Sequence, residues 1–479
     1  MKTFFLVMTA ALLAILPGCA TTSPDSSRTA ASPAASAPVG WAQADVILAR
    51  IKAPVFPAKD FAITDYGAVA GQDGTAAITR AIAACHAAGG GRVVVPAGEF
   101  VTGAIHLLSN VNLYLAKDAT LRFSTDPAAY LPVVYTRWEG VECMNYSAFI
   151  YAFDQENIAV TGEGTLDGAA SDENWWGWAR RGPDKKSRAR PDVTALNDLA
   201  DRGVPVEQRV FGAGHYLRPN FFQPYRCRNV LIEGVTIHRS PMWELHPVLC
   251  TNFIARNVTI DSDGPNNDGC DPESCRDVLM EGVSFRTGDD CIAIKSGRNT
   301  DGRRVGVPVE NVIIRNCQMR DGHAGVAIGS EISGGCRNVF VENCHMDSPR
   351  LDRALRLKSN AARGGLLENV YMRNVEIGSV VEAVLTVDLM YEEGPRGNFP
   401  PVIRNVYLEN ITAHAAPRLF YLLGFPAATI DNINVSNSTI TGVTATEMVQ
   451  NVGHINLTNV TILPEKKVAS ASSREAPAP

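Results

Sequence analysis

The sequence predicts an all-β fold, a right-handed single-stranded parallel β-helix with a helix capping its amino-terminal end. The main observation is a ten-residue pattern that recurs nine times, each copy alternating apolar and polar residues. The copies begin at residues 228, 251, 276, 310, 337, 368, 404, 431 and 453. Their intervals, between 22 and 36 residues, are too irregular for ankyrin or leucine-rich repeats and fit a solenoid with variable loops.

Each copy has the layout of one coil of such a helix. In RNVLIEGVTI, which begins at residue 228, a short alternating strand is followed by glycine and then by a second short strand. Glycine and asparagine at this bend supply the left-handed backbone conformation that the bend needs. Asparagines stacked from coil to coil can also satisfy one another's amides.

The same pattern extends upstream, so we expect one β-helix domain over residues 55–465. Residues 110–123 and 156–166 resemble earlier coils, and residues 74–88 predict an amphipathic helix ending in three glycines. That helix would cover the open end of the stack. Residues 135–216, rich in aromatic and charged side chains, predict an inserted functional loop.

The amino terminus has the layout of an export signal. Residues 1–18 combine Lys2, an apolar run and Pro-Gly, and they are followed by Cys19, as in a bacterial lipobox. We therefore expect a lipidated Cys19 on an Ala/Ser/Pro-rich flexible linker over residues 19–54, and a disordered tail over 466–479. The alternative is ordinary cleavage that removes Cys19. The expected location is a bacterial periplasmic or outer-membrane lipoprotein, or else a secreted protein.

Composition limits the partners. The net charge of −6 argues against a nucleic-acid partner, whereas a membrane tether through Cys19 stays possible. The ten other cysteines are open to two interpretations in an exported protein, namely disulfides or small buried apolar residues.

Three carboxylates carry the first functional hypothesis. Asp268 precedes Asp289 and Asp290 by 21 and 22 residues, which is close to one coil, so the side chains should meet on one face about 4.8 Å apart. Carboxylates held so close cannot all ionise freely, so the pKa of one of them should rise. Identical side chains then become a general acid and a general base.

Cations and a histidine follow at coil spacing. His323 comes one long coil after Asp290, and Arg356 and Lys358 come one coil later, on one face of a strand. Lys295 is a further candidate binding residue. Alone, each residue is better explained as a turn, a structural histidine or a solvated face, but together they suit an anionic sugar, whose carboxylate the cations would hold.

Four short motifs in this order resemble those of the family 28 glycoside hydrolases, the polygalacturonases and their relatives, and the likeness covers residues 61–463. The motifs are NNDG at 266–269, GDD at 288–290, GHA at 322–324 and RLK at 356–358. Asn267 and Ala324 depart from the Thr and Gly that are usual in the family. Both departures flank functional residues and remove none.

The resemblance implies roles for these residues. Asp289 matches the general acid, and Asp268 and Asp290 match the pair that activates water for single displacement with inversion. His323 matches the residue that tunes the acid. Arg356 and Lys358 match the grip on the substrate carboxylate, and Tyr391 and Asn266 are further candidate substrate-binding residues. One coil spacing is shorter than the roughly 6.5–9.5 Å that is general for inverting enzymes.

The implied activity is hydrolysis of α-1,4-linked polygalacturonate or pectin, an acidic polysaccharide, without a metal or another cofactor. Connecting segments look most like bacterial exo-acting members, in which extra loops close one end of the groove. The alternatives are an endo-polygalacturonase, a rhamnogalacturonan-type hydrolase, a Ca²⁺-dependent pectate lyase and a non-catalytic glycan-binding β-helix. His323 and Lys358, which rhamnogalacturonan-cutting members typically lack, favour galacturonan.

Overall fold

The computed structural model describes residues 40–180 and 187–465. The predicted leader, Cys19 and the tail over 466–479 lie outside the described residues. No described helix combines the length and the apolar composition needed to cross a membrane.

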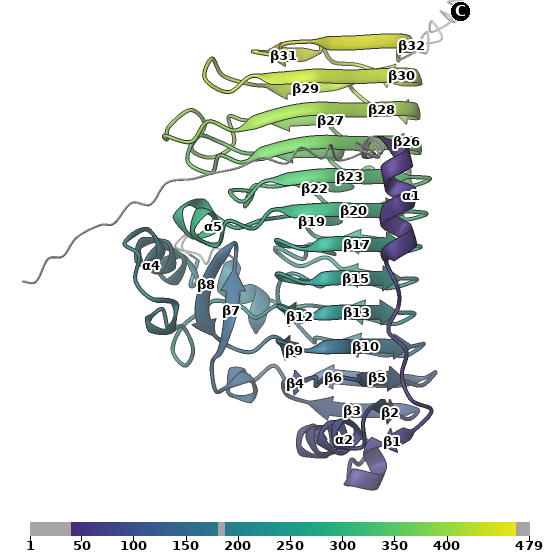
Figure 1. Cartoon of the computed structure of the whole chain (residues 1–479), viewed down its shortest axis with the longest axis vertical. Coiled ribbons are helices and arrows are strands. Elements are labelled where there is room, and N and C mark those ends of the chain that lie inside the picture. The colour runs from purple at the N-terminus through teal and green to yellow at the C-terminus, as the bar shows by residue number, and fades with distance from the viewer. Residues whose placement is uncertain (1–39, 181–186, 466–479) are drawn as a thin grey trace, which may run out of the picture. The chain divides into compact units, whose positions relative to one another are not determined.

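The described chain is a right-handed parallel β-helix whose strands stack in three rows (Figure 1). The first row contains β1 (Asp60–Ala62), β2 (Gly91–Val95), β5 (Val111–Leu115), β10 (Glu156–Gly162), β13 (Arg228–Glu233), β15 (Thr251–Arg256), β17 (Arg276–Glu281), β20 (Val309–Arg315), β23 (Cys336–Glu342), β26 (Leu366–Ser379), β28 (Val402–Ala415), β30 (Ile430–Val443) and β32 (Ile455–Pro464). The second row contains β3 (Gly98–Thr102), β6 (Ala119–Phe123), β11 (Thr165–Asp167), β14 (Thr236–His238), β16 (Thr259–Ser262), β18 (Ser284–Thr287), β21 (Gln318–Arg320) and β24 (His345–Met346), and merges with the first at β26. The third contains β4 (Ile105–His106), β9 (Ile150–Phe153), β12 (Phe222–Tyr225), β19 (Ile292–Ile294), β22 (Val326–Ile328), β25 (Arg353–Lys358), β27 (Ala383–Asp388), β29 (Phe420–Leu423) and β31 (Met448–Gln450).

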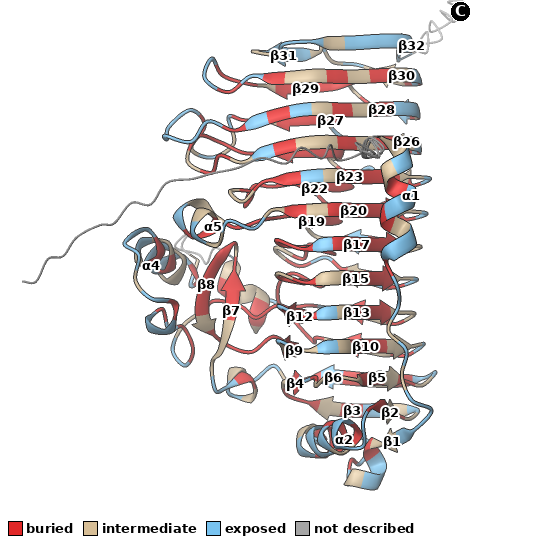
Figure 2. Cartoon of the chain, viewed as in Figure 1, coloured by how far each residue is buried: buried red, intermediate tan, exposed pale blue. Residues whose placement is uncertain are grey.

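The predicted repeat is confirmed in register. The first residues of successive copies pair directly, Arg228 with Thr251 and Thr251 with Arg276. The same register continues through Glu310 and Arg337. Apolar side chains of the three rows form one buried cluster. The buried residues of the strands are red in Figure 2. All ten cysteines of the described residues are free and buried, so here they serve as small apolar side chains.

The expected asparagine ladder is also present. Asn311 has φ 61°, donates to the Asp277 carboxylate at 3.0 Å and accepts from Asn338 at 3.0 Å. Asn369 and Asn405 continue the series, each donating to the asparagine one coil earlier. Each asparagine thus sustains a left-handed bend and a bond between coils at once.

The helices and the hairpin lie outside the three rows. They are α1 (Trp41–Arg50), α2 (Thr75–Ala87), α3 (Trp175–Ala179), α4 (Arg190–Asp201), α5 (Asn299–Val305), the 3₁₀ turns η1 (Ile63–Tyr66), η2 (Pro127–Tyr130) and η3 (Val206–Gln208), and the antiparallel hairpin β7 (Val134–Trp138) and β8 (Val141–Asn145). The predicted capping helix is confirmed by α2, which contacts β1 and β2 at the amino-terminal end of the stack (Figure 1).

The flexible linker predicted over residues 19–54 is wrong for its last part, because residues 41–50 form α1. Ala44 and Ile47 pack on outward-facing apolar residues of first-row strands, including Ile254 and Phe340. Trp41 adds contacts with aromatic rings of β23 and β26. These few apolar residues are enough to hold the helix on the sheet because they pack on a stripe of outward-facing apolar residues. The composition of residues 19–54 alone does not reveal that stripe.

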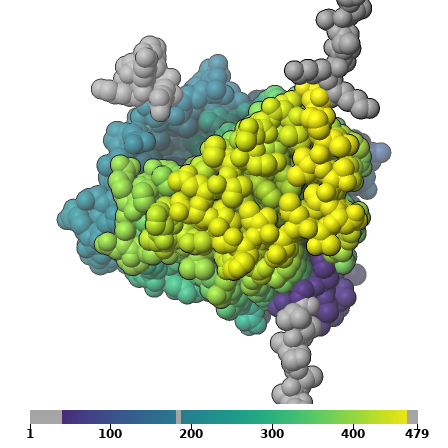
Figure 3. Space-filling model, turned by 90° about the horizontal axis from the view of Figure 1, so that it is seen from above, coloured from purple at the N-terminus to yellow at the C-terminus, as the bar shows by residue number. Residues whose placement is uncertain are grey.

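The insertion predicted over residues 135–216 is interrupted, because β9, β10 and β11 within it form an ordinary coil. Two excursions result, one carrying the β7–β8 hairpin and one carrying α3 and α4. Viewed along the coil axis in Figure 3, the blue segment of these excursions stands on one side of the stack and the purple α1 on the other.

The ladder should be measurably stabilising. We predict that Asn311→Ala lowers the free energy of unfolding by about 2–3 kcal/mol, since it removes two hydrogen bonds and places alanine at a left-handed φ. Asn311→Gly also loses the two hydrogen bonds, but glycine adopts the left-handed φ without strain. Its free energy of unfolding should therefore lie between those of the wild type and the alanine variant. Denaturation midpoints check the order, and equal destabilisation by both variants would show that backbone conformation does not matter there.

Candidate active site

A cavity of about 370 Å³ gathers the candidate residues beside the third row. The β7–β8 hairpin contributes its turn to the wall, and β25 contributes side chains from the coil itself. The lining residues are Glu139, Trp243, Asn266, Asp268, Asp289, Lys295, Arg298, His323, Ser330, Glu331, Asp352, Arg353, Arg356, Lys358, Tyr391 and Glu392. The cavity is therefore strongly polar and holds both signs of charge.

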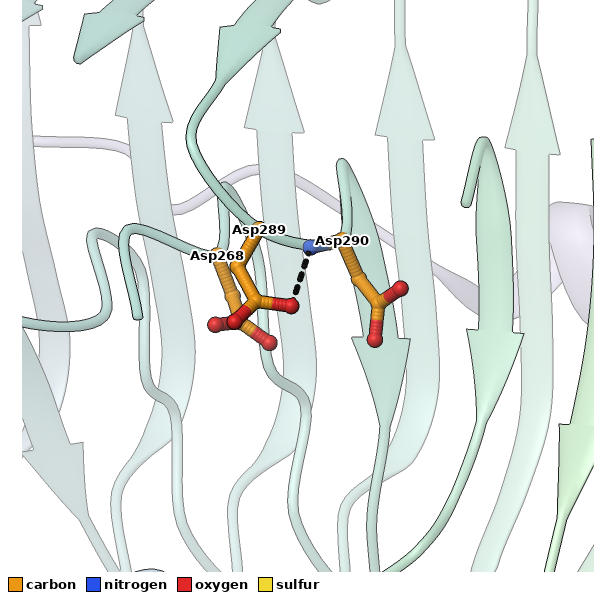
Figure 4. Close-up of side chains that lie close together, drawn as sticks. All are labelled: Asp268, Asp289 and Asp290. Carbon is orange, nitrogen blue, oxygen red and sulfur yellow. Dashed lines mark hydrogen bonds between the residues drawn. The ribbon is translucent and has the colours of Figure 1, made fainter. Parts of the chain in front are cut away.

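The three predicted aspartates meet as the coil spacing requires (Figure 4). One carboxylate oxygen from each of Asp268, Asp289 and Asp290 lies within 4.8 Å of the others. Asp290 is fully buried and its backbone N–H donates to Asp289 Oδ1 at 2.9 Å. The separation is shorter than the general inverting range, as the spacing implied.

Tight backbone contacts hold these aspartates in place. Asn267, fully buried, accepts from Ser262 Oγ and the Gly264 N–H at 2.8 Å each. Its amide donates to two carbonyls of the preceding coil. A Cβ on Gly288 would lie 2.2 Å from the Gly264 carbonyl oxygen, so only glycine fits directly before Asp289. Asn267 thus replaces the usual threonine in a structural position.

His323 is coupled to Asp289. Its Nδ1 lies 2.7 Å from Asp289 Oδ1, and this hydrogen bond raises the pKa of His323. Burial opposes ionisation of Asp289, but the bond and charge of His323, with Lys358 and Lys295, outweigh it and lower the pKa of Asp289 to about 2. In the free site the proton of this pair therefore resides on the imidazole.

Asp268 has a raised pKa, as does the neighbouring Asp271. Burial is the largest cause, followed by the negative charges of Asp271 and Asp289. The predicted upward shift is confirmed, and it falls on Asp268. Asp290 differs in its surroundings, because one of its carboxylate oxygens lies 2.8 Å from the Lys358 ammonium. The two aspartates of this pair are thus identical side chains in different electrostatic environments.

The two cations of β25 differ in how closely they pair with Asp290. Lys358, buried, contacts Asp290 directly, so its loss would leave an uncompensated buried charge. Arg356 Nη1 stays 3.9 Å from Asp290 Oδ1. Both cations lie near the Tyr391 ring, at 5.5 and 5.6 Å from its centroid. Arg356 is the freer of the two to bind an anionic ligand.

Two other predicted binding residues reach the cavity but are held by the protein. The Lys295 ammonium lies 3.1 Å from Glu331, 3.5 Å from Asp271 and 4.0 Å from Asp268. It also lies 4.5 Å from the Trp243 ring centroid. Asn266 Oδ1 accepts from Arg218 at 2.6 Å. Lys295 therefore neutralises buried acidic side chains, in addition to any contact that it makes with a ligand.

Sequence reasoning missed several cavity residues. Glu331, which lines the cavity, sits in the loop after β22. Asp271, three residues after Asp268, is fully buried and is not part of the lining, and its carboxylate oxygens make no hydrogen bond among the described residues. Asp271 follows the NNDG motif by only two residues, so the sequence could have drawn attention to it. Glu139 lies in the β7–β8 turn and Arg298 directly precedes α5. The repeat does not predict where these two segments pack against the coil.

The aspartate trio could also hold a cation, since three carboxylate oxygens lie within 4.8 Å. Positive charge is already supplied there, however, by Lys358 on Asp290 and by Lys295 near Asp268. The donor set is therefore electrostatically balanced by side chains of the chain itself.

Comparisons with known proteins agree with this geometry. The family described as glycosyl hydrolases family 28 matches residues 213–461. The crystal structure of an exopolygalacturonase from Thermotoga maritima is 43% identical, with a TM-score of 0.84, over 88% of this chain and 95% of that one.

Two curated relatives are more distant. An exo-poly-alpha-D-galacturonosidase of Dickeya chrysanthemi is 28% identical over 69% of this chain and 57% of its own length. A probable polygalacturonase of Vitis vinifera is 27% identical over 74% of this chain and 67% of its own length. With the four motifs assembled around one cavity and the family matched over more than half of its residues, the chain belongs to family 28 of the glycoside hydrolases.

Proposed function

We propose that this protein hydrolyses α-1,4-galacturonosidic bonds of polygalacturonate or pectin from a chain end. The single observation that carries the proposal is the cavity itself, in which paired carboxyls stand beside Arg356 and Lys358 and the β7–β8 hairpin forms one wall. Cations suit the carboxylate of an acidic sugar, and a walled cavity suits a chain end. Family membership and the exo-acting relatives support the same activity.

The proposed chemistry is a single displacement with inversion. Asp289 delivers to the glycosidic oxygen the proton that it shares with His323, and the bond to the leaving sugar breaks. A water held between Asp268 and Asp290 attacks the anomeric carbon and gives its proton to Asp290, the member of that pair that contacts Lys358. Arg356, Lys358 and Tyr391 hold the substrate.

Binding of an anionic sugar should help the acid. Lys358 and Lys295 contribute to the low pKa of Asp289 in the free site. A sugar carboxylate placed beside Lys358 offsets part of that positive charge, so the pKa of Asp289 rises and the proton moves from His323 toward the leaving oxygen. Substrate binding thereby favours the protonated form of Asp289, which is the form that acts as the acid.

Early products from a long galacturonan test the proposal. We expect only monomer or only dimer from the first time points, because the walled cavity admits one end. A ladder of sizes would instead mean endo cleavage. Ultraviolet-absorbing unsaturated ends that disappear with a chelator would mean a lyase, and no new reducing ends at all would mean glycan binding alone.

The His323–Asp289 pair predicts a pH dependence. Since the pKa of His323 is raised, the pair keeps its proton below that pKa and loses it as pH rises through it, so wild-type kcat/KM should fall only above the ordinary histidine value of about 6.5. In His323→Gln, Asp289 alone must hold the proton, so the alkaline limb should move to lower pH and kcat should drop at least about tenfold.

The matched control for that profile is His345→Gln, at a half-buried position of β24 outside the cavity. Its pH profile should equal that of wild type. An alkaline limb that stays in place in His323→Gln would contradict the shared proton.

We also propose that the protein is exported, with a lipid on Cys19. The leader layout, with its lysine, apolar run and following cysteine, supports export. Mass spectrometry of the mature amino terminus should find an acylated Cys19, and cleavage at another bond would exclude the lipid.

A further inference from the structure

The turn of the β7–β8 hairpin is unusual for the residue at its tip. Trp138 pairs with Val141, so Glu139 and Gly140 form a two-residue turn with φ of 42° and 82°. Both positions need positive φ, which favours Asn-Gly or Asp-Gly. Glutamate gains nothing locally from this conformation, so a role for its side chain is the better explanation.

The tip is fixed against the coil. The Arg298 N–H donates to the Gly140 carbonyl at 2.9 Å, and a Cβ on Gly140 would lie 2.7 Å from Arg298 N. On either side, Trp138 Nε1 donates to the Arg218 carbonyl at 3.1 Å, and the Glu142 N–H donates to Asp301 Oδ2 at 2.8 Å. Glu139 therefore enters the cavity from a rigid support.

The carboxyl of Glu139 lines the cavity without a partner. Over residues 40–180 and 187–465 it makes no hydrogen bond and no ion pair, whereas Glu331 pairs with Lys295 and Glu392 pairs with Arg363. Burial raises the pKa of Glu139 to about 7, against the attraction of Arg298. A neutral carboxyl can both accept and donate, and it does not repel an acidic sugar.

A chain end differs from the chain interior by one group. In α-1,4-linked galacturonan, every internal sugar uses O1 and O4 in glycosidic bonds, so only the terminal sugar offers a free hydroxyl at one of these atoms. A residue that tells an end from the middle must contact that hydroxyl. The unpartnered, rigidly held group on the hairpin wall meets this requirement.

We propose that Glu139 recognises the chain end through a hydrogen bond to this terminal hydroxyl, an inference that rests on the proposed exo-acting function. The hydroxyl is O4 if the non-reducing end enters the cavity and O1 if the reducing end does. Steric closure by the hairpin excludes the chain interior, and Glu139 selects the correct terminus.

Three trimers of galacturonate test the proposal on the full chain. One is intact, one has an unsaturated non-reducing unit that lacks the 4-hydroxyl, and one is reduced to an open chain at its reducing end. Wild type should lose on the order of 10- to 100-fold in kcat/KM on one modified trimer, and that trimer identifies the terminus. Glu139→Ala should lose a similar factor on the intact trimer and nothing further on that modified one.

Glu139→Gln, which keeps a donor and an acceptor, should retain most of the activity on the intact trimer, and Glu163→Gln, at an exposed position away from the cavity, should match wild type. A Glu139→Ala variant that keeps the wild-type discrimination between trimers would overturn the assignment. Failure of the exo activity itself is distinct, because it appears in wild type as a ladder of early products from long galacturonan.

Discussion

In-register stacking of parallel coils is the constraint on which the rest of this molecule depends. Each coil hydrogen-bonds to the next, so residues at equivalent positions become neighbours whatever the length of the loop between them. Asp268 and Asp289 meet for this reason, and Arg356 reaches them from two coils further on. The loops, freed from holding the fold, vary in length and carry the excursions that shape the cavity.

Stacking also brings several charged side chains close together. Their repulsion is offset because buried acids and cations form ion pairs. Lys358 faces Asp290, and Lys295 faces Glu331 and Asp271. The raised pKa of Asp268 and the raised pKa of His323 reduce the net negative charge of the cluster further. The pKa values of Asp268 and Asp289 are thereby shifted in opposite directions, as the acid and base roles of a glycoside hydrolase require.

Sequence alone predicted what depends on periodicity. The coil repeat, the asparagine ladder, the capping helix and the meeting of the aspartates all follow from spacing and residue type. The docking of α1 could not be predicted in this way, since Ala44 and Ile47 pack on a stripe formed by residues from separate coils. Glu139 was missed for the same reason: the hairpin turn that carries it docks through Gly140 on Arg298 and through Glu142 on Asp301 of α5. The location of the proton on His323 required the 2.7 Å contact with Asp289.

Helix α1 also determines from which side the body can be held. Its residues pack on the outward face of first-row strands, whereas the cavity is lined by residues of the third row and of the β7–β8 turn. Figure 3 shows α1 and the blue excursions on different sides of the stack. Residue 40 therefore joins the body away from the catalytic opening. An enzyme immobilised on a bead or a surface through an exposed residue of α1 would keep the cavity free for large, insoluble pectin.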